Sequence, residues 1–398
     1  MADSSAGAGG RGGSGMRISL NDPVFRAIFW QVVVVGAIGL LIWYLISNTL
    51  HNLEVRKIAT GWGFLDREAG FAIGESLIEF EPEHSYGRAL WVGVLNTLRV
   101  AVIGIVLATI LGTFIGIGRL SKNWLIAKVC SVYVEFMRNL PLLVQLFFWW
   151  AMFQDVFPGP RQALEPITGV FLSNRGIKIP IPAEHWIHAW MGGAFLVGIA
   201  GAYAVSKWAA ARQAATGEQF PVLYSTLGLV LGLPIVVWLI GGAPVTMDWP
   251  VMRGFNFQGG LTMTPEFAAL LVGLVTYTAG FIAEIVRAGI LSVPHGQTEA
   301  SSALGLRRGK MLQLVILPQA LRVIVPPMTS QYLNLTKNSS LAVAIGYPDL
   351  VSIANTTINQ TGQAIEGIAI IMAAYLTVSL SISLFMNWYN KRIAFKER

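Results

Sequence analysis

Residues 299–318 read EASSALGLRRGKMLQLVILP, and this polar, basic run lies between two long apolar segments. The small side chains of Ala300 and Ala303 would let another protein approach closely. Gly305 can end a short helix there, because glycine adopts a left-handed backbone without a steric penalty. The stretch therefore predicts a short helix that another protein contacts. An ordinary amphipathic helix lying on the membrane surface is the alternative interpretation.

The same run contains some of the spacing of a phosphate-binding loop, at Gly309 and Lys310. That motif needs a further glycine at position 304 and a serine or threonine at position 311. The chain has Leu304 and Met311 instead, so the sequence predicts no nucleotide site of its own.

The composition is typical of a polytopic helical membrane protein. Apolar residues make up 54% of the chain, charged residues only 12%, and the mean hydropathy is +0.59. The net charge is +7, but Lys and Arg do not form one patch, so nucleic-acid binding is not predicted. The single cysteine, Cys130, excludes an intrachain disulfide, and no convincing cluster of His, Cys, Asp and Glu predicts a metal or cofactor site.

Apolar runs separated by polar loops predict about eight transmembrane helices, since about 20 residues are needed to cross a bilayer. The first run is expected to be an anchor rather than a removed signal peptide, because no small-x-small cleavage site follows it. The predicted spans are 24–47, 89–117, 125–153, 189–206, 222–241, 265–288, 319–346 (with a kink at Pro326-Pro327) and 364–388.

Lys and Arg are distributed unevenly between the two sides of this predicted bundle. With both termini inside, the inner loops and tails carry fourteen of them, and the longer outer loops carry eight. Cytoplasmic loops carry such an excess, so the asymmetry predicts cytoplasmic termini and a cytoplasmic 289–318 loop. The 48–88 segment, in which acidic residues outnumber basic ones, is predicted to lie outside.

Ionisable residues inside the predicted spans are costly to insert unless they pair or border a polar cavity. Glu135 and Arg138, and likewise Glu284 and Arg287, have the i, i+3 spacing that places an acid and a base on one helix face. Each pair predicts either a structural ion pair or a contact with a transported solute. The seventh span contains a polar run that is tolerable only beside water or partner groups, and its lysine has no acid within a turn. That run includes Asn334, Thr336, Lys337 and Asn338.

The 299–318 run resembles the EAA motif of ABC-importer permeases, in which Glu-Ala-Ala is followed after three residues by Gly and after nine more by Ile-x-Leu-Pro. Ser301 and Val315 are the two departures, and each keeps a small or a β-branched side chain. In that family the helix docks into a separate ATPase subunit, so the resemblance implies that Glu299 meets a basic residue there. The implied ATPase-coupling residues are Glu299, Ala300, Ser301, Gly305, Leu317 and Pro318.

The membrane motifs at 133–145, 283–300 and 334–341 are similar to those of the polar amino acid importer family, of histidine, glutamine and arginine type. Residues 59–65 and 95–100 resemble the general L-amino acid permease branch. The resemblance divides the chain into a permease core made of two segments and further segments outside it. These are a disordered cytoplasmic tail (1–22), a first helix with a periplasmic segment (23–88), the first core segment (89–153), an insertion with two extra helices (154–264), and the second core segment (265–390) with its coupling loop (289–318).

The resemblance implies an all-α, type I ABC importer permease fold in the bacterial inner membrane. The chain would move L-amino acids from periplasm to cytoplasm by alternating access, beside a second, different permease. It would receive substrate from a periplasmic binding protein, and two ATP-binding subunits would hydrolyse ATP, so the chain is not expected to be an enzyme. The candidates for the substrate pathway are the polar residues of the spans: Glu135, Arg138, Glu284, Asn334, Thr336, Lys337 and Asn338.

Two functions of other classes remain open. A secondary amino acid transporter driven by an ion gradient would use Glu135, Glu284 or Lys337 as its coupling group, but it would not explain the 299–318 run. A membrane-embedded enzyme would need a nucleophile with its base or a metal cluster, and the sequence offers neither pattern. Dependence of uptake on ATP or on an ion gradient would separate the ABC permease from the secondary transporter.

Overall fold

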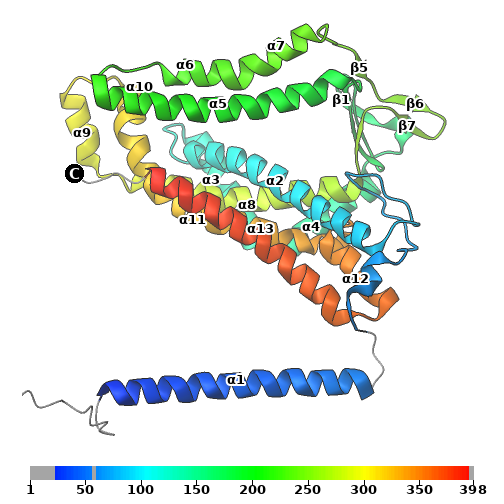
Figure 1. The fold of residues 1–398 in the computed structure, drawn as a ribbon. Helices are drawn as coiled ribbons and strands as arrows, with labels where there is room; N and C mark the ends of the chain where they lie inside the picture. Colours follow the sequence, from blue (N-terminus) through cyan, green and yellow to red (C-terminus); the bar gives the residue numbers. More distant parts are fainter. Residues whose placement is uncertain (1–22, 56–59, 394–398) are drawn as a thin grey trace, which may run out of the picture.

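The computed structural model describes residues 23–55 and 60–393, and these residues are predominantly helical (Figure 1). The tail predicted to be disordered, 1–22, lies outside the described residues. The described residues contain seven helices that are long and apolar enough to cross a membrane. They are Arg26–Val55 in α1 (Pro23–Val55), α2 (Tyr86–Gly118), α5 (Trp186–Thr216), Val222–Ile240, α8 (Pro265–Leu291), Arg308–Ile345, and Ala364–Arg392 in α13 (Ala364–Ile393).

The predicted continuous span at 125–153 is wrong, because the structure has two helices there. α3 (Trp124–Asn139) ends before Leu140, and α4 (Leu142–Ala151) begins after Pro141 and continues through a π-helical turn, Met152–Val156. Proline has no N–H to donate, and its ring disfavours the helical conformation in the residue before it. The segment still supplies an eighth apolar element, Leu142–Val156, that is shorter than a full span.

α8 lies at the centre of the bundle and supplies more buried core residues than any other described helix. Its side chains Leu270, Leu274 and Ile282 are fully buried, and it packs against α2, α3, α4 and α11 (Leu317–Asn338). α2 approaches α8 closely at Gly112, where an added Cβ would lie 2.7 Å from the Cβ of Ile282. The close packing of these two helices therefore depends on the missing side chain.

The predicted loop 289–318 is more ordered than expected. α8 runs to Leu291, the short helix α9 (His295–Ala303) follows, and a new helix begins at α10 (Arg308–Met311). It continues through the π-helical stretch Leu312–Ile316 into α11 and on to the 3-10 turn Ser339–Ile345. Only the first half of the loop is therefore separate from the following membrane helix.

The insertion contains strands that the all-α prediction lacked. β1 (Leu164–Ile167), β2 (Val170–Ser173), β3 (Gly176–Ile179) and β8 (Leu261–Met263) form an antiparallel sheet in that order. β4 (Ile181–Pro182), before α5, pairs antiparallel with β5 (Met247–Asp248), after the second extra helix, and β6 (Val251–Arg253) forms a hairpin with β7 (Asn256–Gln258). Strands of two to four residues are too short to show an alternating pattern, which explains why the sequence did not predict them.

The two extra helices of the insertion pack on each other. α5 lies beside a helix made of α6 (Val222–Leu227), a π-helical turn and α7 (Leu233–Ile240). Gly198 of α5 faces the backbone carbonyl of Leu229, and no side chain would fit between them. Figure 1 shows the strands and α12 (Leu350–Thr361) at one end of the bundle, the strand end, and α9 at the opposite end, the α9 end.

Candidate functional site

α9 is a short helix of small, exposed side chains, as the sequence predicts. It begins after Pro294 and ends in a Schellman motif, in which Gly305 N donates to Ser302 O and Leu306 N donates to Ser301 O. Gly305 has a φ of +71°, the left-handed conformation that was predicted from the sequence. The chain reversal after α9 therefore depends on the left-handed conformation of Gly305.

The side chains of α9 divide into an outward and an inward set. Glu299 is 71% exposed, and its Oε1 lies 3.0 Å from Nδ1 of His295. Ala300 is also exposed, whereas Ser301 is buried and donates to Gln297 O at 2.6 Å. The helix therefore offers one acidic and one small side chain to a partner, and it rests on the bundle through Ser301.

The other matched residues of the run lie where α11 begins. Leu317 and Pro318 form its first turn, and Leu317 is 48% exposed. Gln319, next in the chain, donates from Nε2 to Val315 O at 3.0 Å and contacts Gln297 Oε1 at 3.5 Å. This contact lies between the first half of α9 and the start of the membrane helix.

The polar run of α11 faces two ways. Asn334 and Lys337 are exposed, on the same face as Ser330, and Asn338 is half-buried. Thr336 is fully buried, and its hydroxyl donates to Tyr332 O at 2.9 Å. Among the described residues, Lys337 has no ion-pair partner. The exposed face of α11 thus presents an amide and an ammonium, and no acidic side chain of residues 23–55 or 60–393 pairs with the ammonium.

Glu284 is held in an ion-paired cluster near the α9 end. Its Oε1 accepts from Arg287 at 2.7 Å, and its Oε2 pairs with Arg119, the residue that follows α2. The i, i+3 spacing indicated the first of these pairs. Arg119 was missed, because the sequence places it only in an inner loop. Glu284 therefore has both of its charge partners within this chain.

The second acid and base with i, i+3 spacing behave differently. Glu135 and Arg138 are both exposed at the end of α3, and no ion pair joins them in the described portion of the chain. The Arg138 guanidinium lies over the Phe281 ring instead, with Cζ 5.2 Å from its centroid. The guanidinium edge therefore remains available for an anion.

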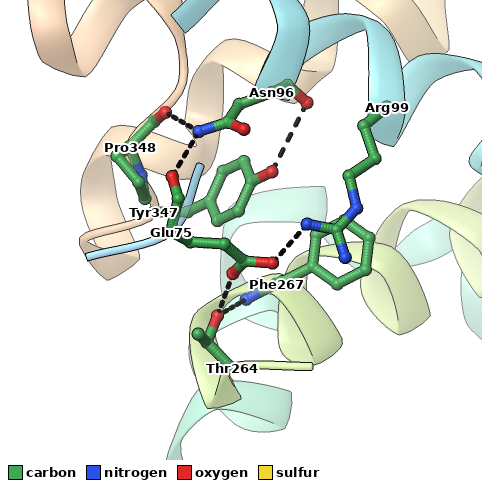
Figure 2. A network of polar contacts seen from close by, with 7 residues as sticks. All are labelled: Glu75, Asn96, Arg99, Thr264, Phe267, Tyr347 and Pro348. Carbon is green, nitrogen blue, oxygen red and sulfur yellow. Dashed lines mark hydrogen bonds and ion pairs between the residues drawn. The ribbon is translucent and has the colours of Figure 1, made fainter. Parts of the chain in front are cut away.

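A further polar network, which the sequence did not indicate, lies at the strand end (Figure 2). Glu75 Oε1 pairs with Arg99 Nη1 of α2 at 2.5 Å, and Thr264 Oγ1 donates to Glu75 Oε2 at 2.5 Å. Thr264 also accepts from Phe267 N at 3.1 Å and so caps α8, while Arg99 stacks 4.1 Å above the Phe267 ring. One carboxylate therefore joins the 60–85 segment to two membrane helices.

Asn96 extends this network to the chain entering α12. Its Nδ2 donates to Glu75 O at 2.8 Å and to Pro348 O at 2.9 Å. Asp349 follows and caps α12 by accepting from Ser352 N at 2.8 Å, and burial raises its pKa to about 6. A polar cavity of about 410 Å³ adjoins the network, lined among others by Glu75, Glu266, Ser352 and Thr356. At the strand end, hydrogen bonds and an ion pair therefore join the 60–85 segment, α2, α8 and the chain entering α12 in one polar network.

Glu75→Gln, in this polar network, should lower the free energy of unfolding of the protein. The side chains of Glu75 and Arg99 are 9% and 13% exposed, so the substitution leaves a guanidinium buried without its counter-charge. Breaking a buried pair in this way costs about 3 kcal/mol. We expect a lower thermal midpoint for the detergent-purified Gln variant. Glu79→Gln is the matched control, because that side chain is exposed and only its backbone carbonyl is used, by Arg88. Equal midpoints for the two variants would contradict the prediction.

Comparison with known proteins identifies the relatives of this chain. The model of a family described as binding-protein-dependent transport system inner membrane component matches residues 220–395. The chain is 48% identical to the general L-amino acid transport system permease protein AapQ of Rhizobium johnstonii, over 97% of this chain and 96% of AapQ. It is 48% identical to the putative amino-acid ABC transporter permease protein YhdX of Escherichia coli, over 96% of this chain and 97% of YhdX. It is 43% identical to the glutamate/glutamine/aspartate/asparagine transport system permease protein BztB of Rhodobacter capsulatus, over 97% of this chain and 98% of BztB.

Proposed function

The chain belongs to the family of binding-protein-dependent transport system inner membrane components, and from this premise we propose how it works. It is a permease subunit of an amino acid ABC transporter. We propose that it moves L-amino acids from the periplasm to the cytoplasm by alternating access. The ion-gradient alternative receives no support from the relatives, whose names describe ABC and transport-system permeases.

We propose that α9 is the helix through which ATP hydrolysis drives this movement. The observation that supports it is an exposed helix of small side chains, ended by a left-handed Gly305 and in contact through its first half with the start of α11. Glu299 and Ala300 would contact the ATPase, Ser301 and Gly305 would set the helix direction, and Leu317 and Pro318 would pass the motion to α11. Hydrolysis itself would occur on two separate ATP-binding subunits.

We further propose that a second, different permease and a periplasmic binding protein complete the assembly. The exposed Lys337 and Asn334 of α11 and the exposed Glu135 and Arg138 of α3 would line the path between the two permeases, with the half-buried Asn338 beside them. Glu284 and Thr336 have their partners within this chain, so we assign them to supporting this path rather than to contacting the substrate. The segments 89–153 and 265–390 would form the permease core, and 23–88 and 154–264 would be additions to it.

Reconstitution tests this proposal. The chain, co-purified with its partner subunits in vesicles, should take up labelled L-amino acids when ATP and the loaded binding protein are supplied. A proton or sodium gradient without ATP should give no uptake. Uptake that follows the gradient and ignores ATP would overturn the proposal.

We propose that both termini and α9 face the cytoplasm and the strand end faces the periplasm. The fourteen-to-eight excess of Lys and Arg supports this orientation. Cysteines that replace Glu83, in the 60–85 segment, and Lys310, in α10, should then be labelled from opposite sides by a membrane-impermeant thiol reagent. The Cys130→Ser background removes the native thiol. Labelling of both positions in intact spheroplasts would contradict this orientation.

A further inference from the structure

The third membrane segment is interrupted at its centre, between α3 and α4. Leu140 has φ −93° and ψ 132°, and Pro141 has φ −56° and ψ 136°, so two extended residues separate the helices. A break inside a membrane leaves backbone carbonyls without helical donors, and no bulk water is present to replace them. The carbonyls at this break therefore need another donor.

Gln145, one turn into α4, supplies that donor. Its Nε2 donates to Met137 O at 2.9 Å and to Leu140 O at 3.2 Å. In an unbroken helix, Met137 O would accept from the N–H of residue 141, which proline does not have. Gln145 is only 4% exposed, so its side chain replaces the missing backbone donor inside the protein.

The oxygen of the same amide is left unsatisfied. Gln145 Oε1 is buried and has no hydrogen-bond partner among the residues that the structure describes. Turning the amide over would place this oxygen against two carbonyl oxygens, so the bonds from Nε2 fix its orientation. Unsatisfied buried groups are rare in native proteins and call for an explanation, and local rules are most often broken at functional sites.

The break presents two polar residues, Arg138 and Asn139, both of which are exposed. α8 holds the last turn of α3 closely at Gly280, where an added Cβ would lie 3.3 Å from Met137 Cβ and 3.5 Å from Arg138 Cγ. The Phe281 ring supports the face of the guanidinium. α8 and the Phe281 ring contact the Arg138 side chain, and the Gln145 bonds hold the backbone on both sides of Arg138 and Asn139.

We propose that this break is a contact point for the carboxylate of the transported amino acid, at which Arg138 binds and Gln145 is the positioning residue. A guanidinium binds a carboxylate through two parallel hydrogen bonds, which need a fixed direction of approach. Every free L-amino acid carries that carboxylate, so the contact accepts any side chain. The inference rests on the proposed amino acid uptake and adds to it the chemical group that is recognised.

The test uses the assembled transporter in vesicles, with the methyl ester of a transported amino acid as a competitor. Gln145→Met keeps the length of the side chain and removes both donors, so it should raise KM for uptake about tenfold while assembly is unchanged. The preference for the free acid over its ester should shrink by a similar factor, and Arg138→Met should have the same effect directly. Gln145→Asn, which keeps the amide on a shorter stem, should recover some of the loss.

Thr276→Val is the matched control, because it removes a hydroxyl that donates to Val272 O at 2.7 Å within unbroken α8. It should leave both KM and the ester preference unchanged. Unchanged KM and ester preference in Gln145→Met and Arg138→Met would overturn the inference, while wild-type uptake would still support the proposed function. If the Gln145→Met variant does not assemble, the Arg138→Met variant tests the inference. A wild-type preference for the free acid over its ester in Arg138→Met would also overturn the inference. No uptake by the wild-type complex would instead reject the proposed function.

Discussion

Gly305→Val should abolish association with the ATPase subunits and amino acid uptake, while the chain still inserts into the membrane. Gly305 has a φ of +71°, and a β-branched residue is a strong outlier in that region. A left-handed conformation costs an ordinary residue about 1–2 kcal/mol, and more for a β-branched one. The Schellman bonds that end α9 would be lost, and Glu299 and Ala300 would no longer be directed at a partner. Co-purification of the ATPase and uptake in vesicles should both fall at least about tenfold.

The environment of Gly305 makes this test specific to the backbone. Apart from Gly305 and its two chain neighbours, no described atom lies within 4 Å of a Cβ added there, so the Cβ of valine meets only the local backbone. Gly309→Val is the matched control: it is equally unobstructed but lies in α10 with an ordinary negative φ, and it should keep ATPase binding. Glu299→Lys tests the same contact by charge, and it should weaken binding to a basic site on the partner. ATPase binding by Gly305→Val at the wild-type level would reject α9 as the coupling helix.

Local features of the chain could be predicted, because their cause lies within a few residues. Gly305 in a left-handed turn and the i, i+3 pair of Glu284 with Arg287 are of this kind, and both are present. The break at Pro141 has an equally local cause, but the apolar run on either side of the proline hid it. A strongly apolar sequence indicates that a segment enters the membrane and does not indicate whether its helix is continuous.

Features that join distant segments could not be predicted. Glu75 and Arg99 are 24 positions apart, and Glu75 and Thr264 are 189 apart, so no spacing rule connects them. Arg119 pairs with Glu284 across 165 positions for the same reason. The faces of α11 are an intermediate case. The 3.6-residue period separates Thr336 from Lys337, but packing against α2, α8 and α13 decides which face is buried.

Lys337→Met, on the exposed face of α11, should sharply reduce uptake without preventing assembly. Lys337 lies inside the apolar segment Arg308–Ile345, and a lysine in a membrane span costs up to about 3 kcal/mol to insert. Within the described ranges no carboxylate pairs with Lys337, and it is exposed beside Asn334 on the open face of α11. Such an ammonium is retained at this cost where a transported carboxylate or a partner subunit uses it.

Methionine keeps the length of the side chain and removes the charge, so Lys337→Met separates the ammonium from the packing of its stem. We expect uptake to fall at least about tenfold, since a hydrogen bond to a charged group is worth about 1.5–3 kcal/mol. ATPase binding should stay normal, because Lys337 lies at the far end of α11 from α9. Lys122→Met, at an exposed lysine between α2 and α3, is the matched control and should transport normally. Normal uptake by Lys337→Met would leave the lysine without a transport role. Failure of the permease pair to assemble would mean instead that the ammonium holds the two subunits together.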